Sequence, residues 1–92
     1  MPIKKTLKIG IVAGEHSGDR LGAGIIQALK SQNDIELFGV GGPKLAAQGL
    51  ISEFDFNKLN VMGIIEPLLN FRELNNLRKK LIKLFKEKEV DY

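Results

Sequence analysis

The first half of the chain alternates between strand-like and helix-like patterns of hydrophobic positions. Apolar runs predict strands at residues 7–13 and 35–40. Between them, residues 19–30 carry apolar side chains at helical spacing, which predicts a helix that covers one face of a sheet. A shorter helix is expected at residues 43–48, because Pro43 suits the first helical position.

The second half is more apolar and less regular. Residues 50–56 predict a short strand or an extended connector. Residues 61–69 are almost continuously apolar, and the proline within them breaks or starts a helix. From Phe71 onward, apolar positions near heptad spacing predict a longer amphipathic helix, and the residues after it, 90–92, look like the approach to a further strand.

These elements predict an α/β protein with a Rossmann-like, open parallel sheet. Two or three parallel strands do not make a sheet that is covered on both faces. We therefore expect residues 1–92 to be the truncated N-terminal domain of a longer protein, with an open sheet edge that invites self-association.

Composition narrows the class of protein. Ninety-two residues with 43% hydrophobic content suit one small globular domain. The absence of cysteine and the single histidine leave little material for a metal site, so neither metal nor cofactor is expected. The apolar run near the N-terminus is short and strand-like rather than a signal peptide, and no run is long enough to cross a membrane, so a cytoplasmic location is expected.

Basic residues concentrate in the last helix, which leaves three interpretations: nucleic-acid binding, contact with an anionic membrane, or solubility. Few aromatic residues stand among the basic ones, so nucleic acid is not the expected partner. Apolar residues beside cations favour a peripheral membrane contact, although a packed core or a partner interface stays open for the same segment. The predicted membrane-contact residues are Met62, Ile64, Ile65, Leu68, Leu69 and Phe71.

The loop after the first strand carries the main candidates for chemistry, because open α/β sheets bind ligands at the carboxyl ends of their strands. Its glycines match neither a dinucleotide-binding pattern nor a P-loop. It has acidic and hydroxyl groups and no cation before Arg20, which suits sugar hydroxyls better than a bare phosphate. The predicted substrate-binding residues here are Gly14, Glu15, Ser17, Gly18 and Asp19.

Structural interpretations of this loop stay open. Ser17 is also a plausible helix N-cap, and Asp19 suits the positive end of the helix dipole. His16 is either a solvated side chain or a catalytic base.

The second glycine-bearing loop follows the strand at residues 35–40. If the two strands are parallel, Gly41 and Gly42 lie beside the first loop and form a crevice floor with exposed backbone amides, so both are predicted to bind substrate. The alternative is a plain strand-to-helix turn.

Four segments in order, residues 12–19, 21–24, 39–43 and 61–66, resemble the N-terminal domain of the lipid-A-disaccharide synthase family, which are bacterial glycosyltransferases. The resemblance implies a two-domain GT-B fold. It implies transfer of a 2,3-diacylglucosamine unit from its UDP-sugar to 2,3-diacylglucosamine 1-phosphate, with inversion, release of UDP and no metal. The implied partners are these acylated substrates and the anionic cytoplasmic face of the inner membrane.

The resemblance also implies that the catalytic base and the UDP-binding domain lie beyond Tyr92, so no catalytic residue is assigned and the piece alone is expected to be inactive. Three alternatives remain. They are another enzyme of the same architecture such as a sugar-nucleotide epimerase, a non-enzymatic α/β binding module, and a vestigial product of a split gene.

Overall fold

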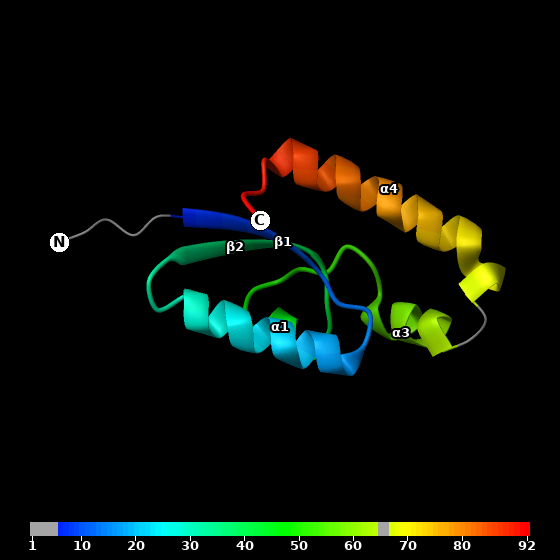
Figure 1. Ribbon diagram of the computed structural model, residues 1–92, viewed down its shortest axis with the longest axis horizontal. Coiled ribbons are helices and arrows are strands. Elements are labelled where there is room, and N and C mark those ends of the chain that lie inside the picture. Colours follow the sequence, from blue (N-terminus) through cyan, green and yellow to red (C-terminus); the bar gives the residue numbers. More distant parts are fainter. Residues whose placement is uncertain (1–5, 65–66) are drawn as a thin grey trace.

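The computed structural model describes residues 6–64 and 67–92, in which a parallel pair of strands lies between helices (Figure 1). The elements in chain order are β1 (Thr6–Val12), α1 (His16–Leu29), β2 (Asp34–Val40), α2 (Pro43–Ala47), α3 (Phe56–Ile64), the 3-10 turn η1 (Pro67–Asn70) and α4 (Phe71–Lys88). None of the described helices has the length and apolar character needed to cross a bilayer.

The two strands pair in parallel with a continuous register from Thr6 opposite Asp34 to Val12 opposite Val40. Parallel pairing confirms the predicted α/β class, and it brings the carboxyl ends of both strands to one edge of the sheet. Gly39 allows the close approach, since its φ of +136° is open to glycine and a Cβ there would collide with the carbonyl oxygen of Ile11.

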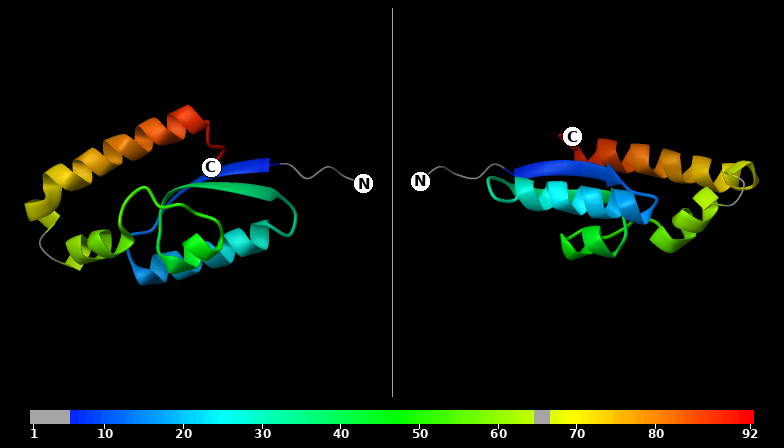
Figure 2. Two further views of the ribbon diagram at one scale, coloured as in Figure 1. Left: turned by 180° about the vertical axis from the view of Figure 1, so that it is seen from behind. Right: turned by 60° about the horizontal axis from the view of Figure 1, so that its bottom comes forward.

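Helices cover both faces of the sheet (Figure 2), so the expectation that so few strands would not be covered on both faces is wrong. On one face, Ile9 of β1 joins a buried cluster with Ile26 of α1 and Leu45 of α2. On the other face, Val40 of β2 packs with Leu77 and Leu81 of α4 in a second cluster. The core is therefore divided by the sheet, which explains why the strands read as nearly continuous apolar runs.

The last two residues lie along the edge of β1 that β2 does not use. The backbone N–H of Asp91 donates to the carbonyl of Lys8 at 2.6 Å, and the N–H of Gly10 donates to the carbonyl of Tyr92 at 2.8 Å. From the first bond to the second, the chain advances in the same direction on both sides, as it does in a parallel pair of strands. Asp91 and Tyr92 thus lie beside β1 in the parallel sense without forming a strand of the described two-stranded sheet, and the sequence predicted only the approach to a further strand.

The start of α1 differs from its prediction, and one helix was not predicted. Helix α1 begins at His16 rather than residue 19, and its N-cap position is the extended Glu15, so the prediction of Ser17 as the N-cap is wrong. Residues 50–55 form a connector without a strand, which confirms the second of the two alternatives predicted there. Helix α3 follows it and was not predicted, because the apolar run obscured it. Asp55 begins that helix by accepting the N–H groups of Asn57 and Lys58 at 2.9 and 3.3 Å.

Candidate functional site

The β1–α1 loop presents polar side chains at the carboxyl end of β1. Glu15, His16 and Ser17 are exposed, and the hydroxyl of Ser17 donates to Oε1 of Glu15 at 2.9 Å. Gly14 and Gly18 are half-buried on either side of them. A carboxylate oriented by a hydroxyl, facing solvent at a strand end, is a suitable acceptor for a ligand hydroxyl.

His16 lies against the start of α3. Its ring contacts that of the buried Phe56 edge-on, with the centroids 5.0 Å apart. Within residues 6–64 and 67–92 the imidazole makes no hydrogen bond to a carboxylate, so this part of the structure offers no partner that would activate it as a base. The contact instead joins α1 to α3.

Asp19 does not face the crevice, contrary to its place among the predicted substrate-binding residues. It is 1% exposed. Its Oδ1 accepts the backbone N–H groups of Gly42 and Leu45 at 2.9 and 3.0 Å, and its Oδ2 accepts that of Lys44 at 2.9 Å. The carboxylate is thereby a cap for α2 supplied by a different helix.

The sequence explains this arrangement. Pro43 has no N–H, so the first turn of α2 exposes donors only from its neighbours, and Asp19 accepts three of them. Asp19 stands in the first turn of α1, as the dipole argument placed it. Its carboxylate nevertheless bonds to the N-terminus of α2, because α1 and α2 are brought together only by the tertiary fold.

The backbone donors of the β2–α2 loop are buried and bonded within the protein, rather than exposed to solvent. Gly41 and Gly42 are buried; the N–H of Gly41 donates to Oγ of Ser52 at 3.2 Å, and that of Gly42 is taken by Asp19. A Cβ on Gly42 would lie 2.8 Å from Oδ2 of Asp19 and from the ring of Phe56. The expectation of exposed amides at these two glycines is therefore wrong, and the contribution of Ser52 is not evident from any pattern in the sequence.

The predicted membrane-contact residues include both exposed and buried side chains in the structure. Leu69 and Phe71 are 78% and 64% exposed, whereas Met62 is buried at 5% and leaves the predicted contact surface. Met62 turns inward because α3 has one buried side, which the continuous apolar run did not reveal. Ile65 lies outside the described residues, as do the side chains of Ile64 and Leu68.

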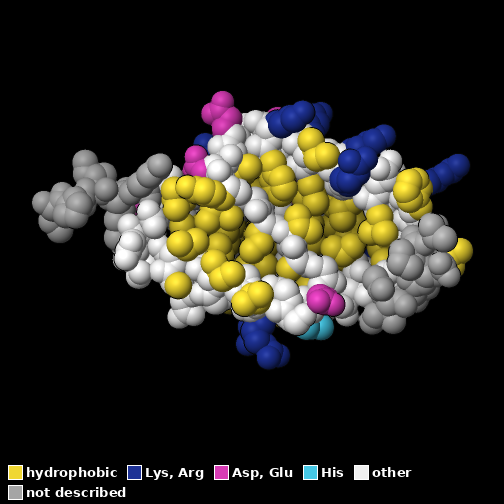
Figure 3. All heavy atoms as spheres, in the orientation of Figure 1, with side chains coloured by type: hydrophobic (Ala, Val, Ile, Leu, Met, Phe, Trp, Pro, Cys, Tyr) yellow, Lys and Arg dark blue, Asp and Glu magenta, His cyan; other side chains and the backbone are white. Residues whose placement is uncertain are grey.

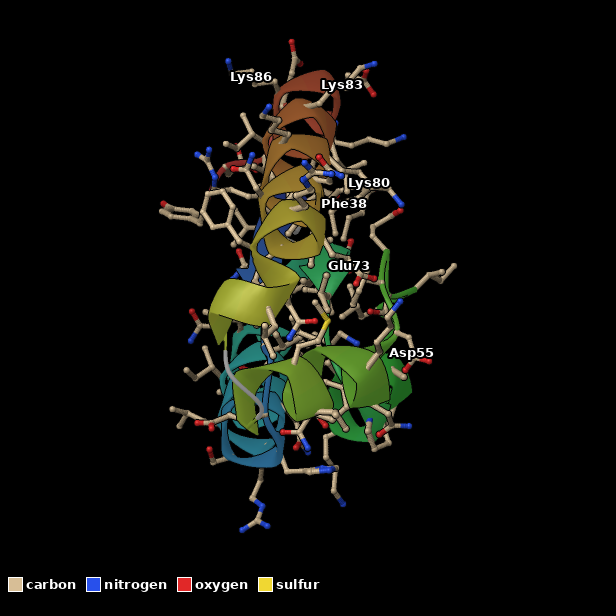
Figure 4. All side chains as sticks on the ribbon, turned by 90° about the vertical axis from the view of Figure 1, so that its right-hand side faces the viewer. Phe38, Asp55, Glu73, Lys80, Lys83 and Lys86 are labelled. Carbon is tan, nitrogen blue, oxygen red and sulfur yellow. The ribbon has the colours of Figure 1, made fainter. Side chains whose placement is uncertain are left out.

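Basic side chains cover the outer surface of α4, which continues directly from this exposed segment. Lys80, Lys83 and Lys86 come from its successive turns (Figure 4). Lys80 also reaches the carboxylate of Glu53 at 3.8 Å, and Lys58 of α3 pairs with Glu73 near the start of α4. All of these lysines are exposed, so the surface stays cationic overall.

Metal binding has no support within the described parts of the chain. No group of three or more His, Cys, Asp or Glu residues there is arranged to hold a metal ion.

Comparison with known proteins gives a consistent result. Residues 9–92 match the model of the lipid-A-disaccharide synthetase family. Among curated proteins, the chain is similar to lipid-A-disaccharide synthases from Pseudomonas fluorescens strain Pf-5 (55% identity over 84% of this chain and 21% of the relative) and Pseudomonas aeruginosa strain PAO1 (48%, over 92% and 23%). The same holds for Vibrio campbellii (47%, over 97% and 24%). The chain thus spans between a fifth and a quarter of the length of these relatives.

Proposed function

Because the chain belongs to the lipid-A-disaccharide synthetase family, we propose that it supplies part of the acceptor-side domain of an inverting GT-B glycosyltransferase. The reaction joins UDP-2,3-diacylglucosamine to 2,3-diacylglucosamine 1-phosphate and releases UDP. The observation that carries the proposal is the family match over residues 9–92, which includes the exposed β1–α1 loop.

In this proposal the β1–α1 loop binds sugar hydroxyls. The Glu15 carboxylate accepts hydrogen bonds from a substrate hydroxyl, and the 2.9 Å bond from Ser17 holds the carboxylate in position. Inversion requires a base that takes the proton from the attacking hydroxyl as the sugar develops positive charge. We assign that base, and the binding of UDP, to polypeptide outside residues 9–92, so that this chain binds and orients substrate and is inactive alone.

A hybrid enzyme tests the reaction. Residues 9–92 of this chain replace the matching segment of the Pseudomonas fluorescens synthase, and the hybrid is supplied with both acylated sugars. We expect formation of the disaccharide with release of UDP, measured by mass spectrometry. A soluble, folded hybrid that binds both sugars without forming product would contradict the proposal.

We further propose that the exposed end of α4 contacts an anionic membrane, from which acylated substrates are drawn. Leu69 and Phe71 supply exposed apolar area, and the basic residues of α4 supply attraction of about 1 kcal/mol each near an anionic surface. The apolar side chains lie at the start of α4 and the basic ones, including Lys80, Lys83 and Lys86, further along it. In this proposal the helix lies along the cytoplasmic face of the inner membrane.

Vesicle flotation of the hybrid measures this contact. The double substitution Leu69→Ser and Phe71→Ser should move most of the protein away from phosphatidylglycerol vesicles, because burial of each side chain contributes about 1.5–3 kcal/mol. The control is Ile51→Ser, which removes a side chain that is 85% exposed outside this segment. Equal flotation of the double variant and the control would refute the assignment.

A further inference from the structure

An apolar groove of about 380 Å³ runs along α4, between that helix, the end of β1 and α3. Figure 3 shows apolar side chains gathered between α4 and the sheet, with basic side chains along the α4 side. Val12 lines the groove from β1 and Leu59 lines it from α3. The other described residues that line it belong to α4, and of these only Arg78 is charged. We call it the α4 groove.

Two rows of α4 side chains form one wall of the groove. Leu77 and Leu81, each 7% exposed, belong to the inner row. Leu74, Arg78 and Ile82 are spaced by four residues and form the outer rim, where Ile82 is 43% exposed. The groove therefore has a packed inner wall and a rim that is open to an occupant.

One end of the α4 groove meets the β1–α1 loop. Val12 is the last residue of β1 and is 52% exposed. Leu59 lies against the loop, since a Cβ on Gly14 would be 3.5 Å from its side chain. Toward the other end, Phe85 lies against β1, where a Cβ on Gly10 would meet its ring at 2.9 Å. The groove thus extends from the candidate substrate-binding loop back along the sheet.

The same end of the groove is adjacent to the exposed apolar segment. Lys58 pairs with Glu73, which brings α3 beside the start of α4. Phe71 is 64% exposed and stands three residues before Leu74, so these two side chains lie on one side of the helix. An amphiphile that leaves a membrane at Phe71 therefore meets the groove at Leu74.

Arg78 gives the rim a charge that the fold does not neutralise. Its Nε and Nη2 donate to Oδ1 of Asn75 at 3.3 and 3.0 Å. Asn75 is uncharged, and no carboxylate of the described residues forms an ion pair with the guanidinium. Asn75 thus orients the group and leaves other N–H donors for an anion, for which a phosphate has suitable geometry. An apolar groove with one such cation is complementary to an anionic amphiphile.

From this arrangement we propose that the α4 groove binds an acyl chain of the acceptor, 2,3-diacylglucosamine 1-phosphate, and that Arg78 binds its phosphate. The inference rests on the proposed function, which supplies the acceptor and assigns its sugar to the β1–α1 loop. Sites for small molecules are mostly apolar and enclose about 300–1,000 Å³. The α4 groove lies at the lower end of that range, so we assign it one acyl chain rather than the whole acceptor.

A membrane phospholipid also has acyl chains and a phosphate. The acceptor is the better occupant because the groove ends at a loop whose Glu15 carboxylate is available to sugar hydroxyls. The exposed residues assigned to the membrane, Leu69 and Phe71, do not line the groove. Membrane contact and acceptor binding should therefore be separable by substitution.

Acceptor binding to the hybrid enzyme tests the groove. Equilibrium dialysis gives the Kd of two acceptors, one with long and one with short acyl chains, without donor or vesicles. Ile82→Trp narrows the groove and should reduce the preference for the long chain about tenfold, the effect of excluding roughly two methylene groups. The control Ile51→Trp adds the same side chain outside the groove and should keep the preference.

Arg78→Gln tests the phosphate contact in the same assay. Loss of the charge-assisted hydrogen bond should raise the Kd of both acceptors about tenfold. Arg72→Gln removes an exposed charge from the same helix outside the groove, and it should change Kd less than about twofold.

Equal weakening of the long-chain and short-chain acceptors by Ile82→Trp, or equal Kd values for the two arginine variants, would overturn the proposal. So would a loss of vesicle flotation by Ile82→Trp as large as that of the Leu69 and Phe71 double variant, since the occupant would then be a membrane phospholipid. A hybrid that binds acceptor as expected but forms no disaccharide would contradict the proposed function alone. Circular dichroism establishes that each variant is folded, and Ile82→Phe replaces a tryptophan variant that is not, with the same expected direction.

Discussion

The two loops at the carboxyl edge of the sheet have similar glycine-rich sequences and opposite roles. The β1–α1 loop leaves the side chains of Glu15 and Ser17 in solvent, where the Ser17 hydroxyl donates to the Glu15 carboxylate. The β2–α2 loop has the N–H groups of Gly41 and Gly42 satisfied by Ser52 and Asp19. One loop therefore has groups available for a ligand, and the other uses its polar groups to hold the fold together.

Asp19 makes the difference between them. It belongs to the first turn of α1, yet its carboxylate accepts three backbone N–H groups from the β2–α2 loop and α2. A buried carboxylate needs several hydrogen-bond donors, because an unpaired buried charge strongly destabilises the folded state. The fixed loop thus holds the start of α1 in place, and with it the exposed Glu15 and Ser17.

The largest expected effect is on the fixed loop. Asp19→Ala leaves three backbone N–H groups without their acceptor, and we expect the free energy of unfolding to fall by about 3 kcal/mol or more. Urea denaturation measures it. Asp34→Ala removes an exposed carboxylate at the start of β2 and should change stability by less than about 0.5 kcal/mol. A similar small change for both variants would show that Asp19 does not hold α2.

A smaller loss is expected for Gly42→Ala. The new methyl group would meet Asp19 and Phe56 at 2.8 Å, and relief of such overpacking costs about 1–3 kcal/mol. Gly24→Ala is the matched control, since no atom lies within 4 Å of its Cβ position and alanine favours a helix by about 0.5–1 kcal/mol. The two changes should therefore have opposite signs in thermal denaturation, and equal signs would contradict the packing described for the β2–α2 loop.

The sequence predicted the parallel sheet, both strands and three of the helices. The spacing of hydrophobic residues and the lengths of the apolar runs are enough to identify such elements. Helix α3 was missed, since residues 61–69 are apolar on all sides and only Asp55 marks where the helix begins. Its buried residue Met62 was consequently placed at the surface.

For the candidate site, the sequence predicted only those features that depend on neighbouring residues in the chain. Exposure of Glu15 and Ser17 follows from a polar loop at a strand end. The role of Asp19 depends on α2, more than twenty residues away, and no local pattern reveals which helix a carboxylate will cap. The hydrogen bond from Gly41 to Ser52 depends on the path of the connector at residues 50–55, which the sequence does not determine.

The most direct test of the contrast between the loops is Glu15→Gln in the hybrid enzyme, with Glu36→Gln, an exposed position of β2, as the control. Loss of one charge-assisted hydrogen bond to substrate should lower kcat/KM about tenfold or more. Because the side chain is exposed, the free energy of unfolding should change by less than about 0.5 kcal/mol. Unchanged kcat/KM for Glu15→Gln, or a loss of stability like that of Asp19→Ala, would contradict the assignment of the β1–α1 loop to substrate.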